Sequence, residues 1–357
     1  MPERLSICLI GSSRYPVREP FAGGLEASIH LLARSLRARG HEVVLFAAPG
    51  SDPALGAREL AVPAFSSSRA ARADVGARPE EWMAEHHAYL GLMMDLVRGR
   101  LAVDVVHNNS LHHLPVAMAG AIAAPMVTTL HTPPLGWLES AVEYAGATTF
   151  VAVSEATRQA WSHALDARVV HNGVDTDAWR AGAGGRRAVW FGRVVPEKGV
   201  HDALDATHAA GLDLDIVGPA LDPGYWAAEV QPRLAPGDRY LGHLAQRDLA
   251  AVIRTSRVAV VTPHWGEPFG LVAAESLASG TPVAGYAQGG LSEIVTPEVG
   301  RLVRSGDLPA LVEAIGHAAE LSRSAAREHA VERFGVERMV RGYEDIYREL
   351  TFEGAAA

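Results

Sequence analysis

Short apolar strands alternate with helical segments along almost the whole of the 357-residue chain. The strands are rich in β-branched residues and lack a polar face, which is typical of parallel strands buried on both sides. We therefore predict an α/β fold built from doubly wound, Rossmann-like sheets. Strands are expected at residues 5–10, 40–46, 60–62, 103–107, 126–130, 149–153, 168–170, 188–191, 212–217, 240–244, 258–261, 281–285 and 302–303.

The chain is long enough for two domains of ordinary size. A polar, glycine-rich stretch at residues 181–187 is typical of a linker. We predict a first domain over residues 1–178, a second over residues 179–335 and a C-terminal helical segment over 336–357. The last helix should end near residue 350, and residues 351–357 should fray.

Composition restricts the class of protein. The chain is 48% apolar and 20% charged, as expected for a globular protein with sizeable cores. A net charge of −9 argues against nucleic acid or an anionic membrane as the main partner. The apolar stretch at residues 116–127 is too short to span a bilayer, and residues 5–10 are too few for a signal core, so we expect no stable membrane insertion and a cytoplasmic location.

Metal-binding patterns are not found in the sequence. The sixteen histidines form no H-E-x-x-H motif or Cys/His cluster, and the single cysteine, Cys8, is expected to be a buried thiol. Asp175 and Asp177 are assigned to a turn, and Asp213 and Asp215 to alternating strand positions. No metal site is predicted.

Residues 258–280 place two glutamates around the start of a helix. A buried strand ends before Pro263, and a helical pattern runs from residue 269 to Gly280, which is suited to end it. The unpaired N–H groups at the helix start, together with the helix dipole, predict an anion site. They belong to Phe269, Gly270, Leu271 and Val272. Glu267 and Glu275 flank this site and are expected to bind hydroxyl groups; solvated glutamates on a surface helix are the alternative.

A basic pair follows the predicted strand at residues 188–191. Arg193 and Lys198 lie five residues apart in Gly-Arg-Val-Val-Pro-Glu-Lys-Gly. An arginine fork and a lysine point charge can together bind a diphosphate in place of a metal ion. Two solvated basic side chains are the alternative.

Further candidates lie at strand and helix ends in the first half of the chain. His131 follows the strand at residues 126–130, where the ends of parallel strands line a crevice; a buried, backbone-bonded histidine is the alternative. Gly23 and Gly24 would let a phosphate approach the backbone, or they form an ordinary turn. They do not match the dinucleotide fingerprint, so NAD is not indicated. Polar residues at 107–113 fit an acceptor pocket or a solvated loop equally well.

Residues 266–283, in which seven residues separate Glu267 from Glu275, resemble the E-x7-E segment of the GT4 family of retaining glycosyltransferases. The Arg193/Lys198 connection and Asn172-Gly-Val-Asp175 are similar to two other segments of that family. The resemblance implies a GT-B fold, in which two Rossmann-like domains face each other across a cleft and the last helix crosses back to the first domain.

The resemblance also implies a role for each site residue. Arg193, Lys198 and the helix start would stabilise the departing diphosphate, Glu267 would hold sugar hydroxyls and Glu275 ribose hydroxyls. His131 would lie beside the donor sugar. The other donor-binding residues expected are Gly23, Gly24, Gly218, Leu244 and Arg247, of which the last two would neighbour the base.

The implied activity is transfer of a hexose-type sugar from a UDP, GDP or dTDP donor to an acceptor hydroxyl, with retention and without a metal or other cofactor. The acceptor is expected to be a sugar, a lipid or a small molecule. A non-catalytic nucleotide-sugar-binding protein and a nucleotide-sugar epimerase of the same fold are the alternatives. Lys198 is the only lysine of the chain and is assigned to phosphate, which argues against a phosphorylase that needs pyridoxal phosphate.

Overall fold

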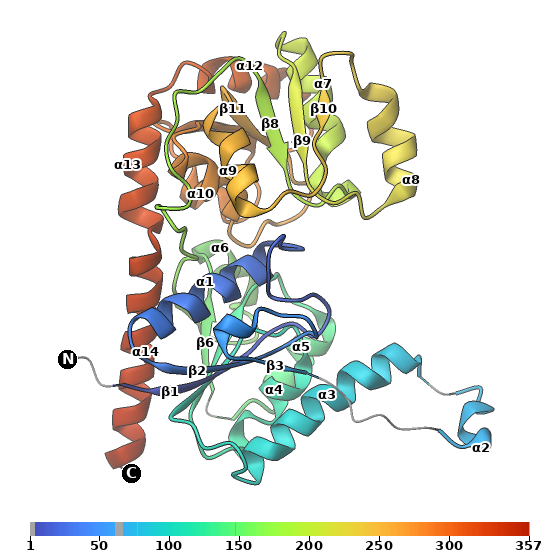
Figure 1. Cartoon of the computed structure of the whole chain (residues 1–357), viewed down its shortest axis with the longest axis vertical. Helices are drawn as coiled ribbons and strands as arrows, with labels where there is room; N and C mark the ends of the chain where they lie inside the picture. Colours follow the sequence, from blue (N-terminus) through green and yellow to red (C-terminus); the bar gives the residue numbers. More distant parts are fainter. Residues whose placement is uncertain (1–3, 61–66, 77, 147, 357) are drawn as a thin grey trace.

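The computed structural model describes residues 4–60, 67–76, 78–146 and 148–356. Over these ranges the strands form two parallel sheets, one in each of two lobes (Figure 1). The first sheet has the order β3-β2-β1-β4-β5-β6-β7, with β1 (Ser6–Ile10), β2 (Glu42–Ala47), β3 (Ala57–Glu59), β4 (Val105–Asn108), β5 (Met126–Leu130), β6 (Thr149–Ala152) and β7 (Arg168–Val169). The second has the order β10-β9-β8-β11-β12-β13, with β8 (Ala188–Phe191), β9 (Leu214–Val217), β10 (Arg239–Tyr240), β11 (Val258–Val261), β12 (Val283–Tyr286) and β13 (Gly300–Val303).

Both sheets reverse their strand order beside the first strand of the sheet, β1 or β8, which is the switch point of a doubly wound fold. The loops that follow β1 and β8 line one cavity, and ligands bind at such switch points in doubly wound folds. The predicted fold class is confirmed.

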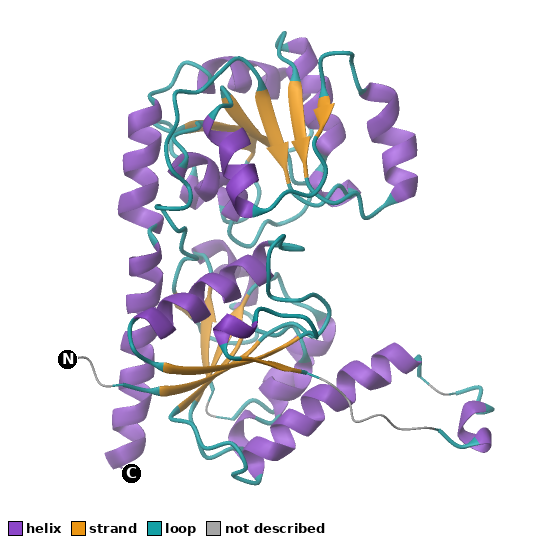
Figure 2. Cartoon of the chain, viewed as in Figure 1, coloured by secondary structure: helices purple, strands orange, loops and turns teal. Residues whose placement is uncertain are grey.

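Helices cover both faces of each sheet (Figure 2). None of the described helices combines the length and the apolarity that crossing a membrane requires. The helices are α1 (Gly24–Ala38), α2 (Arg69–Arg72), α3 (Glu80–Val97), α4 (His113–Ala117), α5 (Gly136–Val142), α6 (Glu155–Trp161), α7 (Val200–Ala209), α8 (Pro223–Tyr225), α9 (Gln246–Arg254), α10 (Leu271–Ala278), α11 (Leu291–Ile294), α12 (Leu308–Ala318), α13 (Arg323–Phe334) and α14 (Val336–Ala356).

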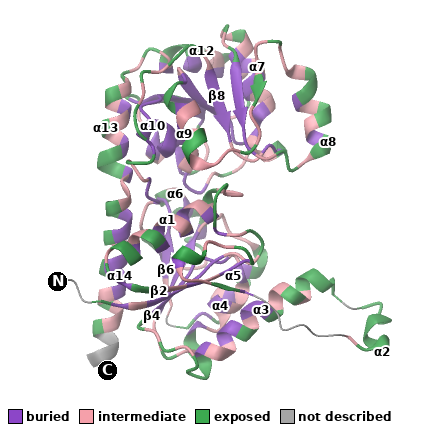
Figure 3. Ribbon diagram, viewed as in Figure 1, coloured by how far each residue is buried: buried purple, intermediate pink, exposed green. Residues whose placement is uncertain are grey.

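The inner strands β4, β5, β8, β9, β11 and β12 are buried along their whole length, as their continuous apolar sequences predict, whereas β3, β7 and β10 at the sheet edges are partly exposed (Figure 3). In β8, Val189 packs into a core with α9, α10 and α13, whereas its neighbour Trp190 packs into a second core with α7 and α12. Successive side chains of a strand point to opposite faces, so one short strand supplies both cores. Full burial of a side chain of this kind contributes about 1.5–3 kcal/mol.

Several element boundaries differ from those expected. α10 begins at Leu271 rather than at residue 269, because Gly270 is its N-cap with φ +101°, and a Cβ there would lie 2.5 Å from Leu291 Cδ2. The strand expected at residues 60–62 is instead β3, at Ala57–Glu59, and residues 61 and 62 lie outside the described residues. α14 continues to Ala356, so the predicted end near residue 350 is wrong. Other strand ends shift by up to about four residues, within the usual uncertainty of sequence-based boundaries.

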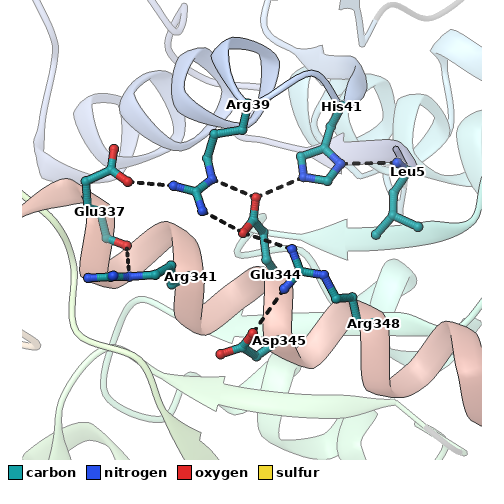
Figure 4. Close-up of polar contacts among 8 residues, drawn as sticks. All are labelled: Leu5, Arg39, His41, Glu337, Arg341, Glu344, Asp345 and Arg348. Atoms are coloured by element: carbon teal, nitrogen blue, oxygen red, sulfur yellow. Dashed lines mark hydrogen bonds and ion pairs between the residues drawn. The ribbon is translucent and has the colours of Figure 1, made fainter. Parts of the chain in front are cut away.

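α14 packs on the first sheet although it follows the second domain in the chain (Figure 1). Its residues Met339, Val340 and Tyr343 belong to the core between that sheet and α1. On its polar side, buried Glu344 accepts hydrogen bonds from Arg39 Nε at 2.8 Å and from His41 Nε2 at 3.0 Å (Figure 4). The backbone N–H of Leu5 donates to Nδ1 of His41, which leaves the proton of the neutral ring on Nε2.

Replacing Glu344 with glutamine should destabilise the protein by about 2–3 kcal/mol at pH 7, because Arg39 would lose its carboxylate at a largely buried site. Burial raises the pKa of Glu344, but the hydrogen bonds from Arg39 and His41 outweigh it and hold the pKa below its usual value. The contribution is therefore present above the unfolded pKa and is lost as pH falls through the folded pKa.

Chemical denaturation of both proteins at pH 7 and at about pH 3 tests this difference. Glu349→Gln, on the same helix but exposed and paired with Arg168, is the matched control and should change stability little. Equal stability of wild type and Glu344→Gln at pH 7 would show that this contact does not hold α14.

Candidate functional site

Two adjoining cavities lie at the boundary between the two domains. The large cavity, of about 340 Å³, is lined by loops that follow β1, β5, β8 and β11 and by the starts of α1 and α10. The small cavity, of about 130 Å³, lies toward the ends of β8 and β9 and the start of α9. Their shared wall consists of Ala22, Gly23, Gly24, Phe191, Gly192, Arg193, Leu271 and Val272.

The structure brings most of the predicted site residues together in these cavities. Those lining the large cavity are Gly23, Gly24, His131, Arg193, Lys198, Glu267, Phe269, Gly270, Leu271 and Val272. The small cavity adds Gly218, Leu244 and Glu275. Arg247 is exposed on α9 and lines neither cavity, which does not support the expected contact with a base.

Lys198 and Glu267 form an ion pair within the large cavity. Lys198 ends a 3₁₀ turn at Pro196–Lys198, and its Nζ lies 2.6 Å from Oε2 of Glu267. The indole Nε1 of Trp265 donates to the same oxygen at 3.0 Å, and Nζ lies 4.8 Å from the centroid of that ring. Both charged side chains are mostly buried, so the pair holds a positive and a negative group in place beside the cavity.

Arg193 and Glu26 face the same cavity from different domains. The Arg193 guanidinium is only loosely paired, 3.9 Å from Glu197. Glu26 lies in the first turn of α1, where burial raises its pKa to about 6 and the charge of Arg193 opposes the shift. Sequence reasoning missed Glu26; its one signal is an acidic residue in the first turn of the helix that follows Gly23-Gly24.

The start of α10 presents backbone donors to the large cavity. The helix hydrogen bonds begin with the N–H of Ala273, which donates to the carbonyl of Gly270 at 2.9 Å. Gly270, Leu271 and Val272 line the cavity, and their N–H groups precede the first hydrogen bond of the helix. This helix end offers partial positive charge to an anion.

Glu275 is buried in α10 beside the small cavity. No described residue is hydrogen-bonded to its carboxylate, and burial raises its pKa to about 8. The carboxyl group is therefore mainly protonated at pH 7, and its oxygens can accept hydrogen bonds from hydroxyl groups of a ligand.

His131 lies in the wall of the large cavity as a neutral imidazole, because burial lowers its pKa to about 4. Its Nε2 lies 3.0 Å from Oδ1 of Asn109. The other polar residues at 107–113 are divided between structural roles. His107 is buried between Thr129 and Tyr347, and His112 caps the start of α4.

The loop that carries Glu267 is held against the first domain. Ser154 caps α6 by accepting from the N–H of Thr157. The hydroxyls of Ser154 and Thr157 both donate to the carbonyl of Pro268 in the second domain, at 2.5 and 2.9 Å. The candidate site is thus assembled from both domains.

The aspartates that sequence analysis assigned to structure have structural partners. Asp175 Oδ1 accepts from the N–H groups of Asp177 and Ala178, which confirms a turn. Asp215 lies on β9 and is paired with Arg187 and Arg239. Asp213 precedes β9, so its predicted strand position is wrong, and it is paired with Arg187. Cys8 is a buried free thiol, as expected.

Comparison with known proteins identifies the family. Residues 22–178 match the model described as Glycosyltransferase Family 4, and residues 178–333 match Glycosyl transferases group 1. The chain is 30% identical to glycogen synthase of Mycobacterium tuberculosis over 318 residues, covering 76% of each protein. AviGT4, a glycosyltransferase involved in avilamycin A biosynthesis, is 25% identical, with a TM-score of 0.72 over 97% of this chain and 98% of that one. Anabaena HepE in complex with UDP-glucose has a TM-score of 0.75 at 19% identity, covering 97% and 100%. The two-domain GT-B architecture and these matches together show that the chain belongs to the GT4 family of glycosyltransferases.

Proposed function

We propose that this protein transfers a hexose-type sugar from a nucleoside diphosphate donor to an acceptor hydroxyl, with retention of anomeric configuration and without a catalytic metal ion. The proposal is supported above all by the convergence of Arg193, Lys198 and the start of α10 on one cavity. These are three sources of positive charge, and the diphosphate is the part of such a donor that requires them. The binding of UDP-glucose by HepE is consistent with a UDP donor; GDP and dTDP donors fit the same charges.

The two cavities suggest how the donor lies. Its sugar and diphosphate would occupy the large cavity, and its nucleoside the small cavity. There Glu275 would accept hydrogen bonds from the two ribose hydroxyls, and Leu244 and Gly218 would lie beside the nucleoside. The acceptor, a sugar, a lipid or a small molecule, would approach from the first domain, where His131 lines the large cavity.

In the proposed step, the bond between the anomeric carbon and the diphosphate oxygen breaks, and its electron pair leaves with the diphosphate. The acceptor oxygen forms the new bond on the same face of the sugar, and its proton passes to the departing diphosphate oxygen. Arg193 and Lys198 stabilise the charge that develops. Glu267, released from Lys198 by the phosphate, accepts hydrogen bonds from sugar hydroxyls, and neutral His131 orients the sugar.

Thermal denaturation with UDP, dTDP, GDP and ADP, and with their common sugar conjugates, should single out one base. A ligand at 100 times its dissociation constant stabilises the fold by about 2.7 kcal/mol, or several degrees at this size. With that donor, NMR of the first product formed should show the donor's anomeric configuration, and added Mg²⁺ should leave the rate unchanged.

Each part of the proposal can fail separately. The absence of a shift with every nucleotide would favour a protein that does not use such donors. An inverted product would exclude retention, and stimulation by Mg²⁺ would exclude the metal-independent step. Reversible change of the donor sugar without transfer would favour the epimerase alternative.

A further inference from the structure

A second polar cluster lies in the second domain, outside the residues that line the two cavities. It consists of His201 and Asp202 at the start of α7 and His264 in the loop before α10. His264 Nε2 lies 3.0 Å from Oδ2 of Asp202, and His201 Nε2 lies 3.5 Å from its Oδ1. The two imidazole rings are stacked, with centroids 5.5 Å apart and planes 12° apart.

The spacing of these atoms fits one metal ion. Tetrahedral zinc, with bonds of about 2.0–2.1 Å, places its ligand atoms about 3.3 Å apart. The nitrogen–oxygen distances, 3.0 Å to Oδ2 and 3.5 Å to Oδ1 of Asp202, are both close to that separation. One ligand atom from each residue lies within 4.8 Å of the other two. The His264 contact is within hydrogen-bond distance, whereas 3.5 Å is long for a hydrogen bond to His201. Each side chain is only partly exposed, at 24%, 17% and 34%.

Two tyrosines support the ligand atoms from behind. The hydroxyl of Tyr225 lies 2.6 Å from Nδ1 of His201, and the hydroxyl of Tyr286 donates to Oδ2 of Asp202 at 2.7 Å. Metal-binding histidines commonly have a partner on the second ring nitrogen, which fixes the ring and leaves the other nitrogen for the ion. The phenol oxygen of Tyr225 can accept a hydrogen bond from the Nδ1–H of His201, which leaves Nε2 for the ion.

Another group of histidines, His86, His112 and His113, is equally close but lacks this arrangement. The N–H of Leu114 donates to Nδ1 of His112. The proton of that neutral ring is therefore on Nε2, and the ring cannot bind a metal through either nitrogen without losing the helix cap. The contrast favours the cluster around Asp202.

The backbone also brings these ligands together. Gly199 has φ +65°, and a Cβ there would lie 2.2 Å from the carbonyl oxygen of Thr262 and 2.9 Å from the His264 ring. Only glycine allows the segment before α7 to approach the loop so closely. Lys198 lies in the first of these two segments and Glu267 in the second. A link between the segments would therefore help to hold the Lys198–Glu267 ion pair in place.

We propose that His201, Asp202 and His264 bind one divalent transition-metal ion, best matched by Zn²⁺, with water as the fourth ligand. A neutral imidazole binds an ion through Nε2 with its proton on Nδ1, so the ion would take the place of the direct contact between His264 and Asp202. The ion would tie the segment after Lys198 to the loop before Glu267. The site does not depend on the transfer reaction proposed above, and its test does not use that activity.

The test is metal binding by the full-length protein after treatment with a chelator and its removal. Zn²⁺ is titrated in competition with a chromogenic chelator, and Co²⁺ binding is followed by visible absorption. We expect one tight equivalent of Zn²⁺ and the strong Co²⁺ bands of tetrahedral coordination. Asp202→Asn and His264→Ala should weaken binding at least a hundredfold.

His163→Ala is the matched control, because it removes a histidine paired with Glu139 on the surface and should leave binding unchanged. Circular dichroism establishes that each variant is folded, and Asp202→Asn, which is nearly isosteric, decides the matter if His264→Ala does not fold. Wild-type protein without a tight equivalent, or variants that bind as wild type does, would overturn the proposal.

Discussion

Replacing Lys198 with alanine is expected to lower the rate of sugar transfer at saturating donor by about 10²–10³-fold. Binding of the nucleoside diphosphate should weaken by about 10–100-fold, since one charge-assisted hydrogen bond contributes about 1.5–3 kcal/mol. The effect on the rate is larger because charge on the leaving oxygen develops only as the glycosidic bond breaks. In this structure Nζ lies 2.6 Å from Glu267 in the wall of the large cavity, within reach of a phosphate that displaces the carboxylate.

Steady-state kinetics and calorimetric titration of the nucleoside diphosphate measure the two effects. Lys198→Arg keeps the charge but changes its shape, so it should recover affinity better than rate. Arg304→Ala removes a highly exposed cation from the same domain and should change neither quantity. If Lys198→Ala transfers sugar at the wild-type rate and binds diphosphate equally well, the phosphate site lies elsewhere.

The ammonium group of Lys198 can also be observed directly, because the chain has no other lysine. Methylation with ¹³C-labelled formaldehyde should give one lysine signal in addition to that of the N-terminus. We expect this signal to move when the nucleoside diphosphate is added, as Nζ exchanges Glu267 for phosphate. A signal that stays in place while the nucleotide binds would contradict the exchange.

The fold was largely predictable because each strand and helix is indicated by the residues within that segment. Most of the short apolar runs, such as residues 188–191 and 258–261, form strands, since a segment without a polar face must be buried on both sides. The site motifs are local too: Arg193 and Lys198 share one connection, and Glu267 precedes one helix. That they meet His131 from the other domain follows only from the family resemblance.

Features that depend on distant contacts could not be predicted in this way. His41 and Glu344 are 303 residues apart, and nothing near either residue indicates their contact. The N-cap position of Gly270 depends on Leu291, which occupies the space that a Cβ would need. Glu26 and the cluster of His201, Asp202 and His264 likewise become apparent only when separate elements are brought together.

Replacing Glu275 with glutamine should stabilise the unliganded protein by about 3 kcal/mol at pH 7. Burial raises the pKa of this carboxyl to about 8 in the folded protein, from 4.5 in the unfolded chain. Between these values the unfolded chain releases a proton that the folded protein keeps, so stability falls by about 1.4 kcal/mol per pH unit. Glutamine is neutral in both states, and the gain should therefore disappear below about pH 4.5.

Urea denaturation at pH 4.5, 7 and 8.5 measures this difference. Glu313→Gln, which changes an exposed glutamate on α12, is the matched control and should leave stability nearly unchanged at each pH. If Glu275→Gln is no more stable than wild type at pH 7, the carboxyl is not held neutral by burial.

The same substitution should weaken nucleotide binding while it stabilises the fold. Ribose hydroxyls that donate to the carboxylate favour its charged form, so nucleotide binding to wild type should release up to about one proton at pH 7 and tighten from pH 6 to 8. Titration calorimetry in buffers with different ionisation enthalpies counts that proton, which the variant cannot release. A variant with a damaged fold would lose both stability and nucleotide affinity. If the carboxylate serves to bind the ligand, the variant should instead be more stable than wild type and bind nucleotide more weakly. If the variant binds nucleotide as tightly as wild type, Glu275 does not bind the ribose.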